Sequence, residues 1–262
     1  MDSRAFWKGR IMKSTLAAVI LSFGAIVTLA HNVNAETAKD GPIVVELFTS
    51  QGCYSCPPAE AYLGELSKNP QVVALEFHVD YWDELVYGSA GKWKDVFSQP
   101  EFTARQKIYA GNLPKGQAYT PQIVVGGTDF AVGSDRRAVR KLIAKAKENN
   151  SLAGVSVLRH SQTELTAKIT GTSERAISVW LVRFLKNVTT RVRSGENKGK
   201  KLTSHNIVTK IKRLSAWSGK SAEFKFEAND MTSAEGCAVL VQEDAQGPIY
   251  GAALCPEGAI NG

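Results

Sequence analysis

Two cysteines separated by two residues, Cys53 and Cys56, are the strongest chemical signal in the sequence. They follow an apolar run at residues 43–48 and precede a helical pattern that starts at Pro57. The first turn of a helix presents unpaired N–H groups and the positive end of the helix dipole, so a thiol placed there is stabilised as the thiolate that attacks disulfides. We therefore predict a catalytic redox pair, with Cys53 as the exposed nucleophile and Cys56 as the resolving thiol.

The other two cysteines, Cys237 and Cys255, are predicted to form a structural disulfide. Each lies nine residues from Gln246, inside the turn-like stretch 244–248, so a symmetric hairpin places them opposite each other. The closed loop would stabilise the fold by about 3 kcal/mol in the chain-entropy treatment. Two buried free thiols are the alternative. A zinc ribbon needs two closely spaced pairs, which these positions do not supply, so we expect no metal site and no cofactor.

The start of the chain predicts export. Four basic residues within residues 4–13 precede an apolar stretch at residues 15–30, and Val33-x-Ala35 has the small-residue pattern of a cleavage site. We expect a signal peptide at residues 1–35, cleavage after Ala35, and a periplasmic or secreted protein without stable membrane insertion; an uncleaved anchor is the alternative. Cleavage leaves 28 basic and 24 acidic residues, a mild excess of positive charge.

Strand and helix patterns alternate in residues 40–150, which we expect to form one α/β domain. Predicted strands cover residues 43–48, 72–79, 122–125 and 130–132, and predicted helices cover residues 57–68, 100–110 and 134–150. The resulting order is β-α-β-α-β-β-α, with the cysteine pair directly after the first strand.

The pattern changes in residues 151–262, where short runs rich in β-branched residues replace the helical stripes. About seven such runs predict an all-β antiparallel sandwich domain. They cover residues 155–158, 165–169, 177–185, 207–214, 222–226, 238–242 and 249–254.

The cysteine pair, the element order and Thr120-Pro121 before the third strand together resemble the thioredoxin family. This resemblance implies a cis peptide bond at Pro121, facing the disulfide, and a Thr120 backbone that binds an extended substrate. Tyr54 and Ser55, which lie between the two thiols, would belong to the same substrate-binding surface. The resemblance also implies that Glu46 transfers the proton of the resolving thiol, although a structural ion pair is an equal alternative for this residue.

Longer strings are similar to an exported bacterial family of thioredoxin-like proteins of unknown function. They cover residues 46–53, 56–59, 78–83 and 119–122, and in the second half residues 195–199 and Trp217. This resemblance implies a fold and a compartment, but no activity.

Three classes of function follow from these signals. The leading one is an envelope thiol–disulfide oxidoreductase that acts on protein or peptide disulfides together with an unidentified redox partner. The alternatives are a non-catalytic binding module with a locked disulfide, and a copper or zinc carrier that uses the cysteine thiolates, with His78 as a third ligand. Residues 183–213 are strongly basic, because they contain ten cations and a single acidic residue, Glu196. This run indicates a solvated face, and we expect no nucleic-acid partner.

Overall fold

Three helices and the first four strands come from the N-terminal half of the part of the chain that is described. A computed structural model describes residues 41–85, 88–148, 152–229 and 231–257, so the predicted signal peptide and the predicted boundary at residue 150 lie outside the described residues. The elements are β1 (Ile43–Thr49), α1 (Pro57–Leu66), β2 (Val72–His78), the short 3-10 helix η2 (Gly88–Ala90), α2 (Pro100–Asn112), β3 (Gln122–Val125), β4 (Asp129–Val132) and α3 (Arg136–Glu148).

Seven strands follow in the C-terminal half. They are β5 (Ala153–Arg159), β6 (Glu164–Gly171), β7 (Ile177–Arg191), β8 (Lys201–Trp217), β9 (Ala222–Glu227), β10 (Glu235–Glu243) and β11 (Ile249–Leu254). Strands β7 and β8 form an antiparallel hairpin and are both longer than predicted. Within the described ranges, no helix is both long and apolar enough to cross a membrane.

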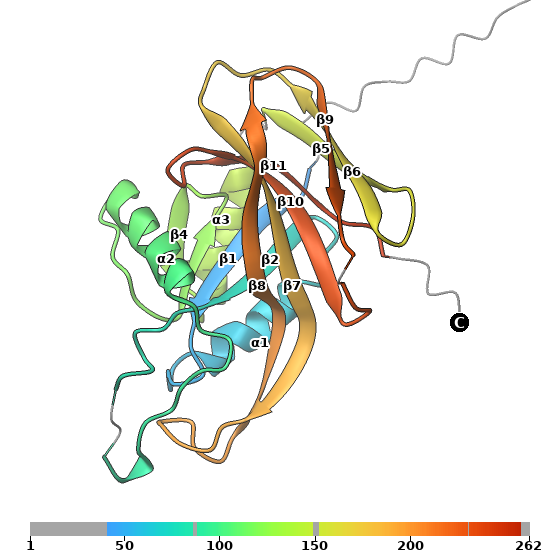
Figure 1. Cartoon of the computed structure of the whole chain (residues 1–262). Coiled ribbons are helices and arrows are strands. Elements are labelled where there is room, and N and C mark those ends of the chain that lie inside the picture. The colour runs from blue at the N-terminus through green and yellow to red at the C-terminus, as the bar shows by residue number, and fades with distance from the viewer. Residues whose placement is uncertain (1–40, 86–87, 149–151, 230, 258–262) are drawn as a thin grey trace, which may run out of the picture. The chain divides into compact units, whose positions relative to one another are not determined.

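The predicted fold class, an α/β thioredoxin-like domain followed by an all-β antiparallel sandwich, is wrong. Strands from both halves join one mixed eight-stranded sheet in the order β11-β10-β7-β8-β2-β1-β3-β4, and β5-β6-β9 form a separate three-stranded sheet (Figure 1). Residues 40–150 and 151–262 therefore do not build separate sheets. The described residues belong to one compact unit that spans residues 36–262.

The edge of β2 explains why the two halves join. All seven residues of β2 are buried, and a sheet that ended there would leave their backbone groups without partners. Strand β8 covers this edge in parallel, with Glu76 in register with Ile207, and the Asn206 side chain donates a hydrogen bond to the Ala74 carbonyl at 3.0 Å. Helix α1 also approaches β8 closely, since a Cβ at Gly64 would lie 2.4 Å from the His205 ring.

Three hydrophobic clusters fill the interior. One lies on the α2 side of the large sheet and contains residues of both halves, among them Phe48, Phe77, Val208 and Leu240. A second lies on the side of α1 and α3, and a third packs the three-stranded sheet against β7, β10 and β11. The β7–β8 hairpin extends beyond the sheet and ends in residues 192–200, which we call the hairpin tip (Figure 1).

Candidate active site around the Cys53–Cys56 disulfide

Cys53 and Cys56 form a disulfide at the start of helix α1. Cys56 is the N-cap residue, Pro57 occupies the first helical position where a missing N–H costs least, and the carbonyl of Cys56 accepts the amides of Ala59 and Glu60. The amide of Cys56 donates to the Cys53 carbonyl, so the intervening residues form a tight turn. The Ser55 hydroxyl lies 3.5 Å from the Cys53 sulfur, within hydrogen-bond reach.

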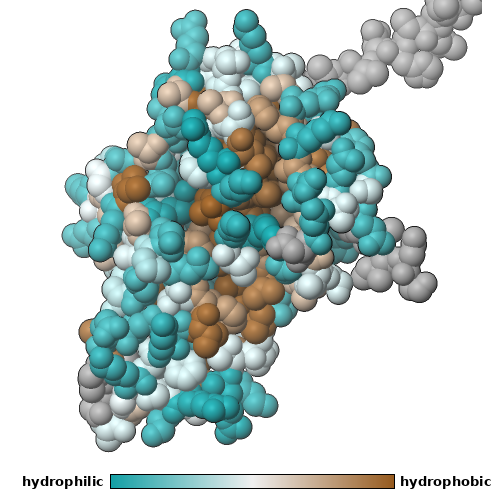
Figure 2. Space-filling model, in the orientation of Figure 1, coloured by the Kyte–Doolittle hydropathy of each residue, from teal (hydrophilic) through white to brown (hydrophobic). Residues whose placement is uncertain are grey.

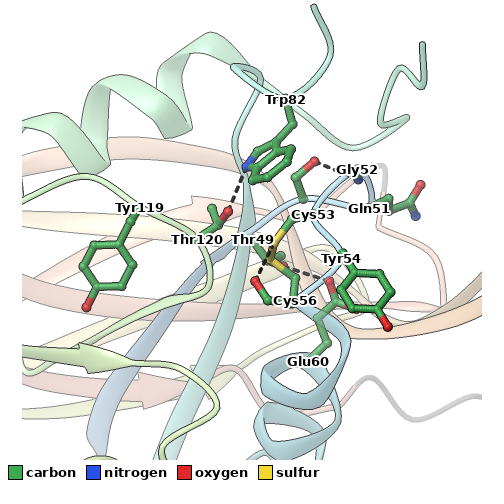
Figure 3. Close-up of a disulfide and its surroundings, with 12 residues drawn as sticks. Thr49, Gln51, Gly52, Cys53, Tyr54, Cys56, Glu60, Trp82, Tyr119 and Thr120 are labelled. Carbon is green, nitrogen blue, oxygen red and sulfur yellow. Dashed lines mark hydrogen bonds between the residues drawn. A yellow bond between two sulfur atoms is a disulfide. The ribbon is translucent and has the colours of Figure 1, made fainter. Parts of the chain in front are cut away.

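Both cysteines are fully buried, which contradicts the expectation of an exposed Cys53. Tyr54, between them, is 66% exposed. Figure 3 places Trp82 beside Cys53, where its indole N–H donates to the Thr120 hydroxyl at 2.8 Å. The exposed turn thus presents its tyrosine to solvent while its sulfur atoms are covered.

The predicted substrate-binding residues lie in two segments. Tyr54 and Ser55 are exposed in the turn between the cysteines. Thr120 and Pro121 are joined by a cis peptide bond; Thr120 reaches the disulfide region through Trp82, whereas Pro121 is buried.

Glu46 lies on the face of β1 opposite to helix α1. Side chains alternate along a strand, so Glu46 shares its face with Phe48, in the cluster near α2, while Leu47 faces α1. Its carboxylate accepts hydrogen bonds from Arg105 Nε at 2.8 Å and from the Tyr109 hydroxyl at 2.5 Å. The structure therefore places Glu46 in a buried ion pair, away from the face that carries the cysteine pair.

Glu60 is the buried carboxyl nearest to the cysteines along helix α1, and the sequence analysis missed it. Its side chain lies one helical turn beyond Cys56 and accepts a hydrogen bond from the Thr49 hydroxyl at 2.8 Å (Figure 3). Burial, with the neighbouring negative charge of Glu76, raises the pKa of Glu60 to about 8. The group is thus mostly protonated at neutral pH. A glutamate in the first turn of a helix usually indicates a solvated partner of the helix dipole, so no local pattern around Glu60 predicts its burial.

A buried charged triad lies next to Glu60. His78 Nδ1 is 2.7 Å from an Asp95 carboxylate oxygen, and His78 Nε2 is 2.8 Å from a Glu76 carboxylate oxygen. Burial opposes protonation of His78, but the two carboxylates outweigh it and raise the imidazole pKa well above 6.5. Although burial also opposes ionisation of Asp95, the His78 cation lowers the Asp95 pKa. The triad is therefore a carboxylate–imidazolium–carboxylate arrangement. Two polar residues at alternate positions of an apolar strand, Glu76 and His78, were the signal that could have revealed it.

The triad connects the loop that carries both cysteines to the second half of the chain. We call this loop, residues 50–56 between β1 and α1, the cysteine loop. Asp95 accepts the backbone amide of Gln51 at 2.7 Å, two residues before Cys53. At the other end, Glu76 accepts the backbone amide of His205 from β8 at 3.0 Å. Because both His78 ring nitrogens are hydrogen bonded, this histidine is not free to join the thiolates as a metal ligand. Among the described residues, no group of three or more His, Cys, Asp or Glu side chains is arranged to hold a metal ion.

The hairpin tip fastens onto the cysteine loop. The fully buried Asn197 donates hydrogen bonds from its side-chain amide to the carbonyls of Gln51 and Cys53, both at 2.9 Å. Glu196 accepts the backbone amide of Tyr54 at 2.9 Å. The motif at residues 195–199, which the sequence associated with a family but not with a role, thus completes the site.

Cys237 in β10 and Cys255, the residue directly after β11, are joined by the second disulfide. A cavity of about 570 Å³ lies beside this bond, far along the chain from Cys53, and Arg159 and Lys186 are among the residues that line it. Both cations already have partners, the Pro256 carbonyl and Glu257. We assign the chemistry to the first disulfide, because the buried acid and the charged triad lie there.

A disulfide that closes a tight turn at a helix start, with a buried acid in the same helix, defines a candidate thiol–disulfide site. Residues 44–242 match a protein family of unknown function (DUF1223), and the chain belongs to that family. This confirms membership in a family of unknown function, as the sequence strings indicated. No curated protein matches the chain.

The chain is similar to solved structures. The crystal structure of protein AGR_C_4864 from Agrobacterium tumefaciens is 30% identical, covers 86% of this chain and 97% of that chain, and has a TM-score of 0.71. A domain of the outer membrane lipoprotein Omp28 from Porphyromonas gingivalis is 9% identical over 41% of this chain and 96% of that chain. Its TM-score of 0.22 is too low for any structural argument.

Proposed function

We propose that the protein is an exported thiol–disulfide oxidoreductase, in which Cys53 and Cys56 exchange disulfides with protein or peptide substrates. The observation that carries this proposal is the position of the Cys53–Cys56 bond at the N-cap of α1. The positive end of the helix dipole stabilises a thiolate there, which makes the thiolate a better leaving group and keeps more of the thiol in its nucleophilic form. Four cysteines in two disulfides are also typical of an oxidising compartment outside the cytosol.

The exchange conserves atoms and electrons between the substrate and the two cysteines. A substrate thiolate attacks Cys53 Sγ, the Cys53–Cys56 bond breaks, and its electron pair leaves on Cys56 Sγ. A second substrate thiolate then attacks the substrate sulfur of the mixed disulfide and releases Cys53 as a thiolate. The substrate dithiol is oxidised by two electrons, the protein disulfide is reduced, and the reverse sequence reduces a substrate disulfide.

Glu60 supports this chemistry as a store for one proton. Because its pKa is raised to about 8, it holds a proton at neutral pH one turn away from the leaving thiolate of Cys56. Neither Glu46 nor His78 fits this task, because Glu46 is paired with Arg105 and His78 is held between two carboxylates.

Mixed-disulfide trapping tests the proposal. Cys56→Ser leaves Cys53 as a lone thiol, so a disulfide peptide should accumulate on Cys53 as a stable adduct visible by mass spectrometry, with one peptide sulfur released as a thiolate. Reduced wild-type protein should convert the same peptide to its dithiol without accumulation, and Cys53→Ser/Cys56→Ser should give no adduct. Absence of both turnover and adduct would contradict an oxidoreductase.

Complete burial of both sulfur atoms favours a second candidate, a binding module with a locked disulfide. In that case a redox titration in glutathione buffers, read by alkylation of Cys53 and Cys56, should show no reduction until the protein unfolds. The oxidoreductase predicts reduction of this pair in the folded state while Cys237–Cys255 stays oxidised.

A further inference from the structure

Five exposed cations lie in and beside the hairpin tip, which binds the turn between the cysteines. They lie at the end of β7, in the hairpin tip and at the start of β8, and we call them the basic tip: Arg191, Arg193, Lys198, Lys200 and Lys201. Figure 2 shows mainly hydrophilic residues over the lower end of the molecule, where Figure 1 places this hairpin end. Glu196 is the single acidic residue between Arg191 and Lys201, and its carboxylate accepts the Tyr54 amide.

The charge of the basic tip is not matched in the way that it is at several other positions. Arg136–Glu65, Lys145–Asp129 and Arg175–Glu243 are ion pairs in which a carboxylate lies against the cation. Within the described ranges, none of the five cations of the basic tip forms an ion pair. Arg191 and Lys201 even face each other across the hairpin, where like charges destabilise a strand pair. The accumulated positive charge therefore works against the stability of the hairpin and remains available to an external anion.

The basic tip is continuous with the candidate active site. Lys200 Nζ lies 4.3 Å from the centre of the exposed Tyr54 ring, and it donates a hydrogen bond to Asn197, whose amide binds the Cys53 carbonyl. A polypeptide that binds over the exposed Tyr54 therefore lies next to the basic tip. At physiological ionic strength charges are screened over about 8 Å, so carboxylates within a few residues of the reacting cysteine would feel the basic tip.

We propose that the basic tip selects acidic polypeptides as substrates of the Cys53–Cys56 pair, through aspartate and glutamate side chains that flank the reacting thiols. This inference rests on the proposed oxidoreductase function and adds its substrate class. Opposite charge across the contact speeds encounter and orients the chain, and both effects weaken with salt.

Exchange rates with three matched peptides test the proposal. Each peptide carries the same two cysteines, flanked by four glutamates, four glutamines or four lysines, and reacts with the oxidised protein in 20 mM and 500 mM NaCl. Alkylation and mass spectrometry give the second-order rate constants. The glutamate peptide should react at least tenfold faster than the lysine peptide at low salt, and the ratio should fall to about threefold or less at high salt.

Charge-reversal variants locate the effect. Arg193→Glu/Lys198→Glu alters two exposed side chains of the basic tip and should abolish or reverse the preference for the glutamate peptide. Lys210→Glu/Lys212→Glu makes the same change in net charge at exposed positions further along β8 and should keep the preference. Circular dichroism checks that both variants are folded, and the salt dependence of the wild type tests the proposal without any variant.

The outcomes separate this inference from the proposed function. Equal rates for the three peptides, or equal losses of preference in both double variants, would overturn the selection of acidic chains while leaving the oxidoreductase intact. Failure of the glutamine peptide and of both charged peptides to exchange at all would overturn the oxidoreductase, and the substrate class with it.

Discussion

The two disulfides lie in interiors of opposite character. Cys237–Cys255 links adjacent strands in a cluster of apolar side chains, and the Cys255 amide donates directly to the Cys237 carbonyl. Cys53–Cys56 lies at a helix start beside a buried acid, a charged triad and a loop clamped by Asn197. An apolar interior keeps a disulfide by packing, whereas a polar interior can supply charge and protons to thiols. This difference in surroundings supports the proposal that Cys237–Cys255 is structural and Cys53–Cys56 reactive.

The strongest test of this contrast removes the charge at the centre of the polar interior. His78→Leu leaves Glu76 and Asp95 buried without their cation, which should lower the free energy of unfolding by about 3–5 kcal/mol. Urea unfolding followed by circular dichroism measures the change. Lys212→Ala, an exposed substitution on β8, should stay within about 0.5 kcal/mol of wild type. A loss of the same small size in His78→Leu would show that the triad is not charged.

The pH dependence of stability tests Glu60. Its folded pKa of about 8 exceeds the ordinary value of 4.5, so the unfolded chain ionises first and unfolding releases a proton between these values. Stability contributed by Glu60 should therefore fall as the pH rises from about 4.5 to about 8, by an amount on the order of a few kcal/mol.

Glu60→Gln removes this titration and should gain stability relative to wild type across the same pH range. Urea unfolding at pH 5, 6, 7 and 8 provides the measurement. Glu65→Gln, at an exposed position of the same helix, is the matched control. Its free energy of unfolding should change with pH in parallel with that of the wild type. Parallel curves for Glu60→Gln as well would mean that Glu60 ionises normally.

Removal of each disulfide tests the two roles separately. The loops closed by Cys237–Cys255 and by Cys53–Cys56 have sequence separations of 18 and 3, so the chain-entropy treatment assigns them about 3 and about 2 kcal/mol. Cys237→Ser/Cys255→Ser should therefore lower the melting temperature more than Cys53→Ser/Cys56→Ser, and it should leave exchange at Cys53 unchanged. If loss of Cys237–Cys255 also stopped the exchange, the division between structural and reactive bonds would be wrong.

The smallest expected change in stability comes from the clamp of the cysteine loop. Asn197→Ala removes two hydrogen bonds to the carbonyls of Gln51 and Cys53 and should cost about 1–3 kcal/mol. Because it also loosens the cover of the disulfide, reduction of Cys53–Cys56 by dithiothreitol should become faster. Asn187→Ala, on β7, is the control variant and should not change the reduction rate. Slower or unchanged reduction in Asn197→Ala would argue against a cover that must open.

The sequence predicted the elements better than their association. Apolar periodicity located the helices and strands, because the buried side chains of an element form a local apolar pattern in the sequence. The symmetry around Gln246 indicated that Cys237 and Cys255 lie opposite each other. The contact between β2 and β8 produces no such pattern, since backbone pairing at Glu76 and Ile207 does not depend on side-chain type. The polar ends of β7 and β8 also carry no apolar pattern, which is why both strands were predicted too short.

The candidate site was predicted only in part. Spacing identified Cys53 and Cys56, but the clamp on the backbone around Cys53 comes from a residue that is remote in sequence, Asn197. Of the two roles predicted for Glu46, the structure has the ion pair, because strand alternation turns this residue away from α1 and towards Arg105. The buried Glu60 looked like an ordinary first-turn glutamate.

The clamp between Asn197 and the Cys53 carbonyl also sets an order of events during biosynthesis. The two residues are 144 positions apart, and at about 5–20 residues per second a ribosome needs roughly 7–30 s to travel from one codon to the other. Throughout that interval the nascent chain contains both thiols but not the hairpin whose Asn197 binds the Cys53 carbonyl. The loop around Cys53 therefore acquires its clamp only late in synthesis, well after both thiols have been made.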